Sequence, residues 1–240
     1  MSRVALVTGG TRGIGAEISR QLKAAGRTVV ASYAGNDEAA KKFSDETGIK
    51  VMKFDAGDFA ACKEAVDHIH ATVGKIEILV NNAGITRDAT MSRLTRDMWD
   101  AVSDTNLGSC FNLCKLTFDD MRAAKFGRVV NIGSINGQAG QYGQVNYAAA
   151  KSGIHGFTKA LAQEGARFGI TVNAIAPGYV DTDMVRAVPE DVLQKIIARI
   201  PMGRLGHADD IARGVVFLTA DNGDFITGST LSINGGQHMY

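Results

Sequence analysis

The sequence predicts an α/β fold in which helices cover both faces of a parallel sheet. Short runs rich in β-branched residues alternate along the chain with longer segments of helical period, which is typical of parallel strands joined by crossover helices. Within the runs, apolar residues follow one another instead of alternating with polar ones, as at residues 78–80 and 129–130, which indicates strands covered on both faces. A glycine-rich turn directly after the first run supports the same class.

Each of the seven expected strands is a short apolar or β-branched run. They fall near residues 3–8 (VALVT), 28–33 (TVVASY), 50–54 (KVMKF), 76–80 (IEILV), 127–133 (GRVVNIG), 170–176 (ITVNAIA) and 229–233 (STLSI).

Helices are expected in the gaps, notably at residues 14–25, 37–46, 59–73, 106–124, 146–168 and 208–220. The first helix opens at the glycine-rich turn. Asn36 is expected to cap the second, with Asp37 in its first turn. All three prolines fall between residues 177 and 201, where the alternation is least regular, and we expect a substrate lid at about 178–205.

Composition bounds the class of protein. With 45% hydrophobic residues and a net charge of +1, residues 1–240 can form a single domain, and neither nucleic acid nor an anionic membrane is expected as a partner. Cys62, Cys110 and Cys114 form no CxxC pair, so we expect reduced thiols. Cys110 and Cys114 have no histidine in their segment and are expected to be buried apolar side chains and not metal ligands. No signal segment or long apolar run is present, which favours the cytoplasm.

A dinucleotide site is expected at the segment TGGTRGIG, where the first strand passes into a helix. Gly9, Gly13 and Gly15 allow the backbone to approach a pyrophosphate, and the N–H groups at the helix start favour its charge. A tight strand-to-helix connection without a ligand is the alternative. The second strand ends at Ser32 and Tyr33 without the acid that NAD-binding proteins place there, whereas Arg12 offers a cation, so NADP(H) is preferred.

Tyr147 and Lys151 lie four residues apart at the start of a long expected helix. Such a pair arises by chance in about one chain in four of this composition, but residues at this spacing share a helix face. An ammonium on that face would lower the pKa of the phenol and make it a usable proton donor.

These motifs together resemble the short-chain dehydrogenase/reductase family over essentially the whole chain, in order. The matching segments are TGGTRGIG, NNAG at 81–84, NYAAAK and PG at 177–178. The resemblance implies a doubly wound, Rossmann-like sheet and the catalytic residues Asn106, Ser134, Tyr147 and Lys151. In the family, the tyrosine donates a proton to the carbonyl oxygen, the serine hydrogen-bonds to that oxygen, the lysine binds the nicotinamide ribose, and the asparagine holds a water.

The resemblance also implies the cofactor-binding residues. They are Gly9, Thr11, Arg12, Gly13, Ile14, Gly15, Tyr33, Asp55, Asn82, Ala83, Gly84, Tyr147, Lys151, Pro177, Gly178, Val180 and Thr182. Asp55 could instead cap the following helix, and Thr182 could simply begin the lid.

Within the family, the likeness is greatest to members that reduce acetoacetyl-CoA to (R)-3-hydroxybutyryl-CoA with NADPH in bacterial polyhydroxybutyrate synthesis. It implies a homotetramer and a substrate site formed by Ser134, Gln141, Tyr142, Gln144, Tyr147 and Tyr179. One alternative substrate is a 3-ketoacyl group on an acidic carrier protein. Basic residues at Arg87, Arg93, Arg96, Arg122, Lys125 and Arg128 could serve such a carrier, meet CoA phosphates or lie in solvent. A remote alternative is a nucleotide-sensing protein without turnover.

Overall fold

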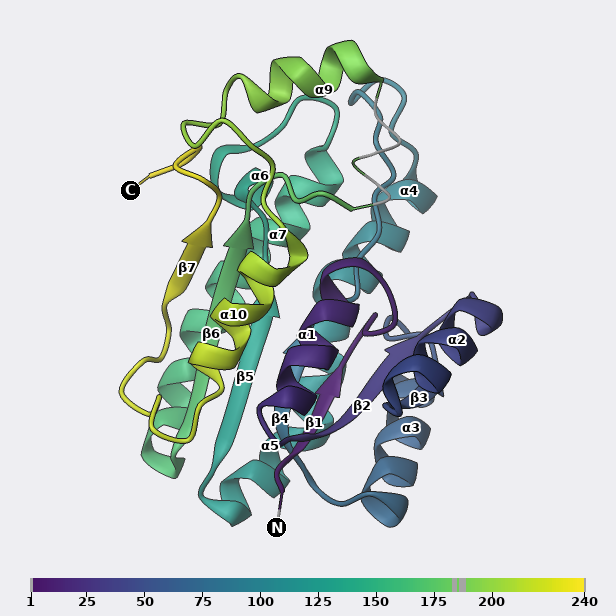
Figure 1. The fold of residues 1–240 in the computed structure, drawn as a ribbon, viewed down its shortest axis with the longest axis vertical. Helices are drawn as coiled ribbons and strands as arrows, with labels where there is room; N and C mark the ends of the chain where they lie inside the picture. The colour runs from purple at the N-terminus through teal and green to yellow at the C-terminus, as the bar shows by residue number, and fades with distance from the viewer. Residues whose placement is uncertain (1, 183–184, 186–188, 240) are drawn as a thin grey trace.

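A computed structural model of the chain describes residues 2–182, Val185 and residues 189–239. Seven parallel strands form one sheet in the order β3-β2-β1-β4-β5-β6-β7 (Figure 1). The strands are β1 Val4–Val7, β2 Thr28–Tyr33, β3 Lys50–Lys53, β4 Ile76–Asn81, β5 Gly127–Ile132, β6 Ile170–Pro177 and β7 Thr230–Ile233. The predicted fold class is confirmed, and each expected strand lies within about two residues of its observed bounds.

Helices connect the strands in the described part of the chain. They are α1 Gly13–Ala24, α2 Asp37–Thr47, α3 Phe59–Thr72, α4 Arg96–Ser103, α5 Ser109–Ala124, α6 Ile135–Ala139, α7 Val145–Gly165, α9 Glu190–Ile197 and α10 Ala208–Leu218. A π-helical turn over Asp104–Gly108 joins α4 to α5, and a 3₁₀ turn over Ala166–Phe168 follows α7. None of the described helices is long and apolar enough to span a bilayer.

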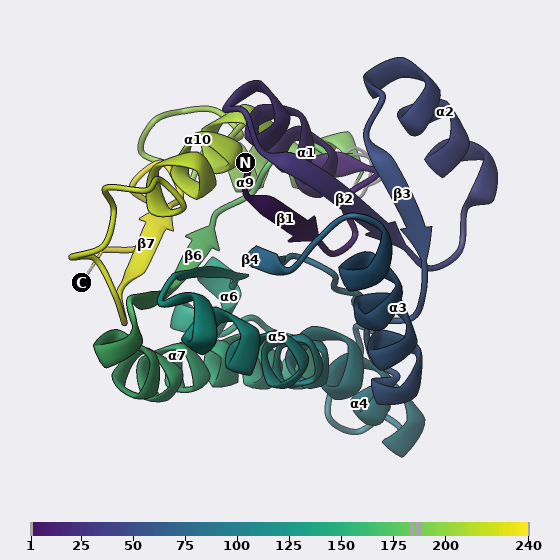
Figure 2. The same cartoon turned by 90° about the horizontal axis from the view of Figure 1, so that it is seen from below.

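The helices form a layer on each face of the sheet (Figure 2). One core packs α1, α2 and α10 against the sheet and includes Ile18, Phe43 and Val215. The other packs α3, α5 and α7 against the opposite face and includes Cys62, Leu113 and Ala162. Both layers exclude water from the middle of the sheet, which explains why its central strands are the most apolar, whereas the edge strands β3 and β7 carry exposed residues.

The strand order reverses between β1 and β4. From β1 the chain builds outward through β2 to β3, and it then returns to β4 on the other side of β1. In such sheets the loops that follow the two strands at the reversal run in opposite directions. The crevice between these loops, at the carboxyl ends of the strands, binds ligands. The glycine-rich turn after β1 and the NNAG segment at the end of β4 therefore lie at the expected ligand crevice.

One predicted helix boundary is wrong. The helix expected at 106–124 belongs to a continuous helical stretch that starts ten residues earlier, at Arg96, where the Thr95 hydroxyl accepts a hydrogen bond of 3.2 Å from the N–H of Met98. Asn106 consequently lies inside the π-helical turn and not at a helix start. Part of the stretch expected to be an irregular lid is the helix α9, and residues 183–184 and 186–188 of that lid fall outside the described residues.

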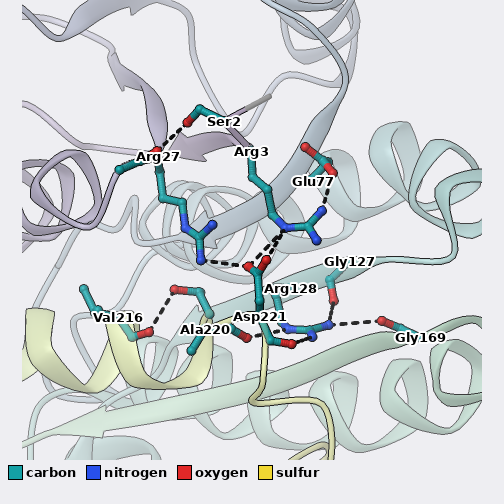
Figure 3. A network of polar contacts seen from close by, with 12 residues as sticks. Ser2, Arg3, Arg27, Glu77, Gly127, Arg128, Gly169, Val216, Ala220 and Asp221 are labelled. Atoms are coloured by element: carbon teal, nitrogen blue, oxygen red, sulfur yellow. Dashed lines mark hydrogen bonds and ion pairs between the residues drawn. The ribbon is translucent and has the colours of Figure 1, made fainter.

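The amino-terminal ends of the strands are tied together by a polar network (Figure 3). Arg3 and Arg27 both pair with Asp221, and Arg3 also pairs with Glu77 at 2.6 Å. The guanidinium of Arg128 is buried beneath them and donates to four backbone carbonyl oxygens, those of Gly127, Gly169, Ala220 and Asp221, at 2.9–3.2 Å. Arg128 is therefore not available to an anion in solvent, and none of the three alternatives considered for it, a carrier, a CoA phosphate or solvent, applies.

Candidate active site

The loop after β1 packs so closely that several of its positions require glycine. Gly9 and Gly13 have φ values of +59° and +51°, in the left-handed region that disfavours a side chain. A Cβ at Gly15 would overlap the carbonyl oxygen of Gly9, and one at Gly10 would lie 2.7 Å from the carbonyl oxygen of Val7. Gly10, which the sequence analysis did not single out, is thus as constrained as the three glycines that it did.

The start of α1 fits an anionic ligand. Arg12 is the N-cap residue in an extended conformation, its side chain makes no capping hydrogen bond, and the first turn contains no acid. Within the described part of the chain, no side chain accepts from the N–H groups that open the helix, from Gly13 to Gly15, and the helix dipole favours a phosphate there. Thr11 precedes these groups, Ile14 lies among them, and both side chains are half-buried.

Asn82 fixes this loop to the end of β4. Its side-chain amide donates to the carbonyl oxygens of Thr8, at 2.8 Å, and Gly9, at 3.3 Å. The Thr8 hydroxyl in turn accepts from the N–H groups of Asn82 and Ala83, both at 2.9 Å. Asn82 therefore positions the cradle, and the same contacts bring Ala83 against it.

Three side chains meet at the carboxyl ends of β2 and β3. As predicted, Asn36 caps α2 by accepting from the N–H of Ala39 at 2.9 Å, which places Asp37 in the first turn. Asp37 pairs with Lys53 at 2.9 Å and is hydrogen-bonded by the Tyr33 hydroxyl. Both contacts lower the pKa of Asp37, so its carboxylate stays charged and occupied.

Asp55 does not cap α3, the alternative considered for it. The cap is Asp58, which accepts from the N–H groups of Ala60 and Ala61 at 2.8 and 3.2 Å. Asp55 is exposed, and its carboxylate accepts from the N–H of Gly57 at 2.8 Å, which orients it in the loop beyond β3.

Ser134 and Tyr147 form the centre of the site. Ser134 lies two residues beyond β5, caps α6 by accepting from the N–H of Asn136 at 3.1 Å, and hydrogen-bonds to the Tyr147 hydroxyl. Burial raises the pKa of Tyr147, the bond to Ser134 opposes that shift, and the carboxylate of Asp88 adds to it. Tyr147 is thus held in its protonated form.

Lys151 lies one turn along α7 and is 4% exposed. Its ammonium nitrogen donates to the carbonyl oxygen of Ile132 at 2.7 Å and lies 5.7 Å from the centroid of the Tyr147 ring. Burial lowers the pKa of Lys151 to about 8. The expected lowering of the tyrosine pKa by this lysine is not found in the ligand-free protein, because both groups are dominated by their own desolvation.

Asn106 and Gly84 close the site on the side of β4. Both polar atoms of the Asn106 side chain bind the backbone of Ile85: the oxygen accepts from its N–H at 2.8 Å, and the amide donates to its carbonyl at 3.0 Å. A Cβ at Gly84 would lie 3.3 Å from the Asn106 side-chain oxygen and 3.6 Å from the Lys151 nitrogen. The π-helical turn therefore places Asn106 beside Lys151.

A hydrogen-bonded chain that sequence reasoning did not detect borders Tyr147. The Asn136 amide donates to the Gln144 side chain at 2.9 Å, and Gln144 donates to the carboxylate of Asp88 at 2.7 Å. The carboxylate of Asp88 raises the pKa of both Tyr147 and Tyr179. Only the tertiary fold brings the 88 and 144 segments together, although Asp88 lies four residues beyond the NNAG segment at 81–84.

The remaining residues predicted for the site lie at the end of β6, in the segment that follows it and just before α7. Pro177 ends β6, Gly178 hydrogen-bonds to the carbonyl of Ile233 at 2.9 Å, and Val180 is buried in the core. A Cβ at Gly13 would lie 3.8 Å from the methyl carbon of Thr182, so the segment after β6 approaches the glycine loop. Gln141 is exposed and Tyr142 is 87% exposed, so the structure does not bring these two into the enclosed part of the site.

All three cysteines are buried free thiols, as expected for Cys110 and Cys114. Burial raises the pKa of Cys62 to about 12 and that of Cys110 to about 11. Among the described residues, no group of histidine, cysteine and acidic side chains is arranged to hold a metal ion.

Comparison with known proteins gives matches along the whole chain. A family model described as enoyl-(acyl carrier protein) reductase matches residues 9–238. An acetoacetyl-CoA reductase of Shinella zoogloeoides is 62% identical over 238 residues, 99% of each chain, and one of Rhizobium meliloti is 59% identical over 240 residues, 100% of each chain. A 3-oxoacyl-(acyl-carrier-protein) reductase of Salmonella typhimurium is 45% identical over 239 residues, 99% of this chain and 98% of the relative.

Proposed function

The chain belongs to the short-chain dehydrogenase/reductase family, and on that premise we propose that it reduces acetoacetyl-CoA to (R)-3-hydroxybutyryl-CoA with NADPH. Membership of the family implies a nicotinamide cofactor. The observation that carries the reaction is the hydrogen-bonded pair of Ser134 and Tyr147, which offers two hydroxyl groups to one substrate oxygen beside the glycine cradle. Such a pair suits the reduction of a ketone.

The protein supplies the proton and the orientation. A bound reduced nicotinamide supplies the hydride, which is the chemistry that the cofactor brings. Tyr147 gives its proton to the oxygen that becomes the alcohol, and its raised pKa keeps that proton in place until the negative charge develops. Ser134 donates a hydrogen bond to the same oxygen. Lys151 would bind the nicotinamide ribose. Asn106 orients the Ile85 backbone on the side of the site next to Lys151.

The preference for NADPH is supported by the charges near the glycine loop. Arg12 is exposed, and its side chain makes no ion pair with any described residue, so its guanidinium is free to bind a 2′-phosphate. Asp37, the acid nearest the end of β2, is already bound by Lys53 and Tyr33. Near the cradle, Arg12 thus offers a cation, and the acid closest to the end of β2 is already paired.

The choice of thioester follows from the relatives and from the basic residues. Identity is 59–62% to the two acetoacetyl-CoA reductases and 45% to the carrier-protein reductase. Of the six basic residues considered for docking an acidic carrier, Arg128 is buried, Arg96 pairs with Asp100 and Arg122 pairs with Asp119. Arg87, Arg93 and Lys125, half of the set, remain as candidates for a carrier-docking patch.

The proposal extends to assembly, location and the lid. A cytoplasmic homotetramer would cover apolar side chains that α5 and α7 expose in the single chain, among them Phe111 at 55% and Val145 at 44%. Residues 178–205 would close over the acyl group, with Tyr179 facing it. A solution mass equal to that of one chain would contradict the tetramer.

The decisive experiment compares acetoacetyl-CoA with acetoacetyl-carrier protein, each with NADPH and NADH, by the loss of reduced-nicotinamide absorbance. We expect the largest kcat/KM for acetoacetyl-CoA with NADPH. Tyr147→Phe should bind the cofactor normally and lose roughly 100-fold or more in kcat. A larger kcat/KM for the carrier-protein substrate would assign the alternative function. Turnover by Tyr147→Phe near the wild-type rate would show that Tyr147 is not the proton donor.

Substrate recognition is tested by Gln144→Ala and Tyr179→Ala. Both should raise KM for acetoacetyl-CoA and leave the affinity for NADPH unchanged, because neither side chain touches the glycine cradle. Gln163→Ala is a suitable control, since that glutamine is an exposed residue of α7. Equal KM values in all three variants would contradict the proposed acyl site.

A further inference from the structure

Lys53 lies beside Tyr33 at the end of the sheet nearest the cofactor cradle. The two residues are register partners on the parallel strands β3 and β2, each the last residue of its strand. Their side chains converge on Asp37: Lys53 approaches the carboxylate to 2.9 Å, and the Tyr33 hydroxyl also hydrogen-bonds to it. One carboxylate is therefore held from two sides.

This group is adjacent to the glycine loop. The N–H of Gly10 donates to the carbonyl oxygen of Ser32 at 2.9 Å, and the N–H of Gly9 approaches the Ser32 hydroxyl at 3.4 Å. The loop thus lies against the last residues of β2. In doubly wound sheets the adenosine ribose lies at this strand end, where a free acid accepts a hydrogen bond from the 2′-hydroxyl of NAD.

An unpaired Asp37 would oppose the proposed cofactor. Its carboxylate would repel a 2′-phosphate and would offer the 2′-hydroxyl of NADH an acceptor. The sequence alone gives no sign that this acid is occupied, because Lys53 is 16 residues away along the chain. The pairing depends on the register of β2 with β3.

Resting on the proposed use of NADPH, we propose that Lys53 is a specificity-determining residue for the cofactor. By binding Asp37 it removes the acceptor that NADH would use and cancels the charge that would repel the 2′-phosphate, which leaves Arg12 to bind that phosphate. Lys53 acts through Asp37 and is a positioning residue in this scheme.

The alternative is an ordinary surface ion pair with no effect on the cofactor. Lys53 and Asp37 are 51% and 65% exposed, and exposed pairs contribute little to stability. The two readings differ in what the loss of Lys53 changes: a surface pair would alter nothing measurable, whereas the proposed role alters the ratio of NADPH to NADH affinity with the melting temperature unchanged.

The experiment measures binding without turnover. Four variants, Lys53→Met, Asp37→Asn, the double variant and Lys50→Met, are titrated with NADPH, NADH and adenosine 2′,5′-bisphosphate, with nicotinamide fluorescence or heat as the readout. Lys50 is the matched control, since it is an exposed lysine at the opposite end of the same strand.

Lys53→Met should weaken NADPH and adenosine 2′,5′-bisphosphate binding by about fivefold and strengthen NADH binding by about twofold or more, because the freed Asp37 carboxylate can then accept from the 2′-hydroxyl. Asp37→Asn added to Lys53→Met should restore NADPH affinity to within about twofold of wild type, and Lys50→Met should bind like wild type. The Lys53→Met effect should shrink at about 1 M salt.

Equal NADPH affinities for Lys53→Met, Lys50→Met and wild type would overturn the assignment, and so would a double variant that stays as weak as Lys53→Met. A wild-type protein that binds NADH as tightly as NADPH would instead refute the proposed cofactor. The two failures are therefore separate.

Discussion

The ammonium nitrogen of Lys151 lies 5.7 Å from the ring centroid of Tyr147, and the hydrogen bond that it donates goes to the backbone of β5 instead of the phenol. The sequence spacing placed the two side chains on one face of α7 correctly. It could not show that burial outweighs their mutual effect: the pKa of Tyr147 is raised, and that of Lys151 is lowered to about 8. The phenol therefore keeps its proton in the folded protein, as the proposed role of Tyr147 as proton donor requires.

Tyr147 should ionise above its ordinary pKa in the ligand-free protein, because burial disfavours the phenolate. The measurement is the ultraviolet difference titration of wild type minus Tyr147→Phe, which isolates this one tyrosine. A tyrosinate signal that appears well below the ordinary tyrosine value of about 10 would contradict the raised pKa.

Asp88→Asn should lower the pKa of Tyr147, because the carboxylate of Asp88 repels the phenolate. Asparagine retains an oxygen that can accept from the Gln144 amide, so the hydrogen-bonded chain is preserved. In the same difference titration, tyrosinate should form at lower pH than in wild type. An unchanged titration would show that Asp88 does not face Tyr147. Asp45→Asn, at an exposed ion pair on α2, is the matched control.

Because Lys151 is buried, it should make the free energy of unfolding rise with pH in the alkaline range. Its pKa is about 8 in the folded protein and 10.5 as the reference value, so between these values the unfolded chain holds a proton that the folded chain lacks. Stability therefore rises with pH across that window. The free energy of unfolding of wild type relative to Lys151→Met should increase by roughly 2–3 kcal/mol from about pH 7 to about pH 10.

Urea unfolding of the ligand-free proteins measures this difference. The hydrogen bond from Lys151 to Ile132 that methionine cannot make adds little to the slope, which mainly reports the buried charge. Lys159→Met on the exposed side of α7 should show no comparable slope. A wild-type advantage that is flat or falls with pH would contradict a lowered lysine pKa.

Structural features formed by residues close together in the sequence can be predicted from it, whereas contacts between distant residues cannot. Strands and the glycine cradle are local in sequence, and both were predicted. The helix expected at 106–124 was begun ten residues too late, although α4 is itself amphipathic and capped by Thr95. The five-residue helix α6 is too short to give a periodic signal. Asp88 and Lys53 act on residues 56 and 16 positions away, so only the folded register reveals their partners.

Gly137→Ala should disturb the catalytic pair without touching it. A Cβ at residue 137 would lie 2.6 Å from the carbonyl carbon of Lys151, so α6 must move away from α7. That movement carries Ser134, which caps α6, away from Tyr147. We expect kcat to fall by about tenfold or more with the cofactor affinity unchanged. Gly35→Ala, where a Cβ meets nothing within 4 Å, is the control. Unchanged kcat in a folded Gly137→Ala protein would contradict this packing constraint.

Arg128→Met should lower the free energy of unfolding and leave the active site unchanged. Arg128 is 2% exposed and satisfies carbonyl oxygens of the β5, β6 and β7 connections, while the ring of Phe126 lies 4.2 Å from its guanidinium carbon (Figure 3). Methionine matches the volume but leaves these buried oxygens without a donor. The expected loss is about 3–5 kcal/mol in urea unfolding.

Arg128→Lys separates charge from geometry. A single ammonium keeps the charge but cannot reach carbonyls on several sides as the guanidinium does, so we expect a smaller but clear loss of about 1–3 kcal/mol. Arg122→Met removes an exposed pair with Asp119 and should cost less than about 1 kcal/mol. Because the network lies at the amino-terminal ends of the strands, NADPH affinity of the folded Arg128→Lys protein should match wild type. A stability equal to that of Arg122→Met would show that the buried arginine is dispensable.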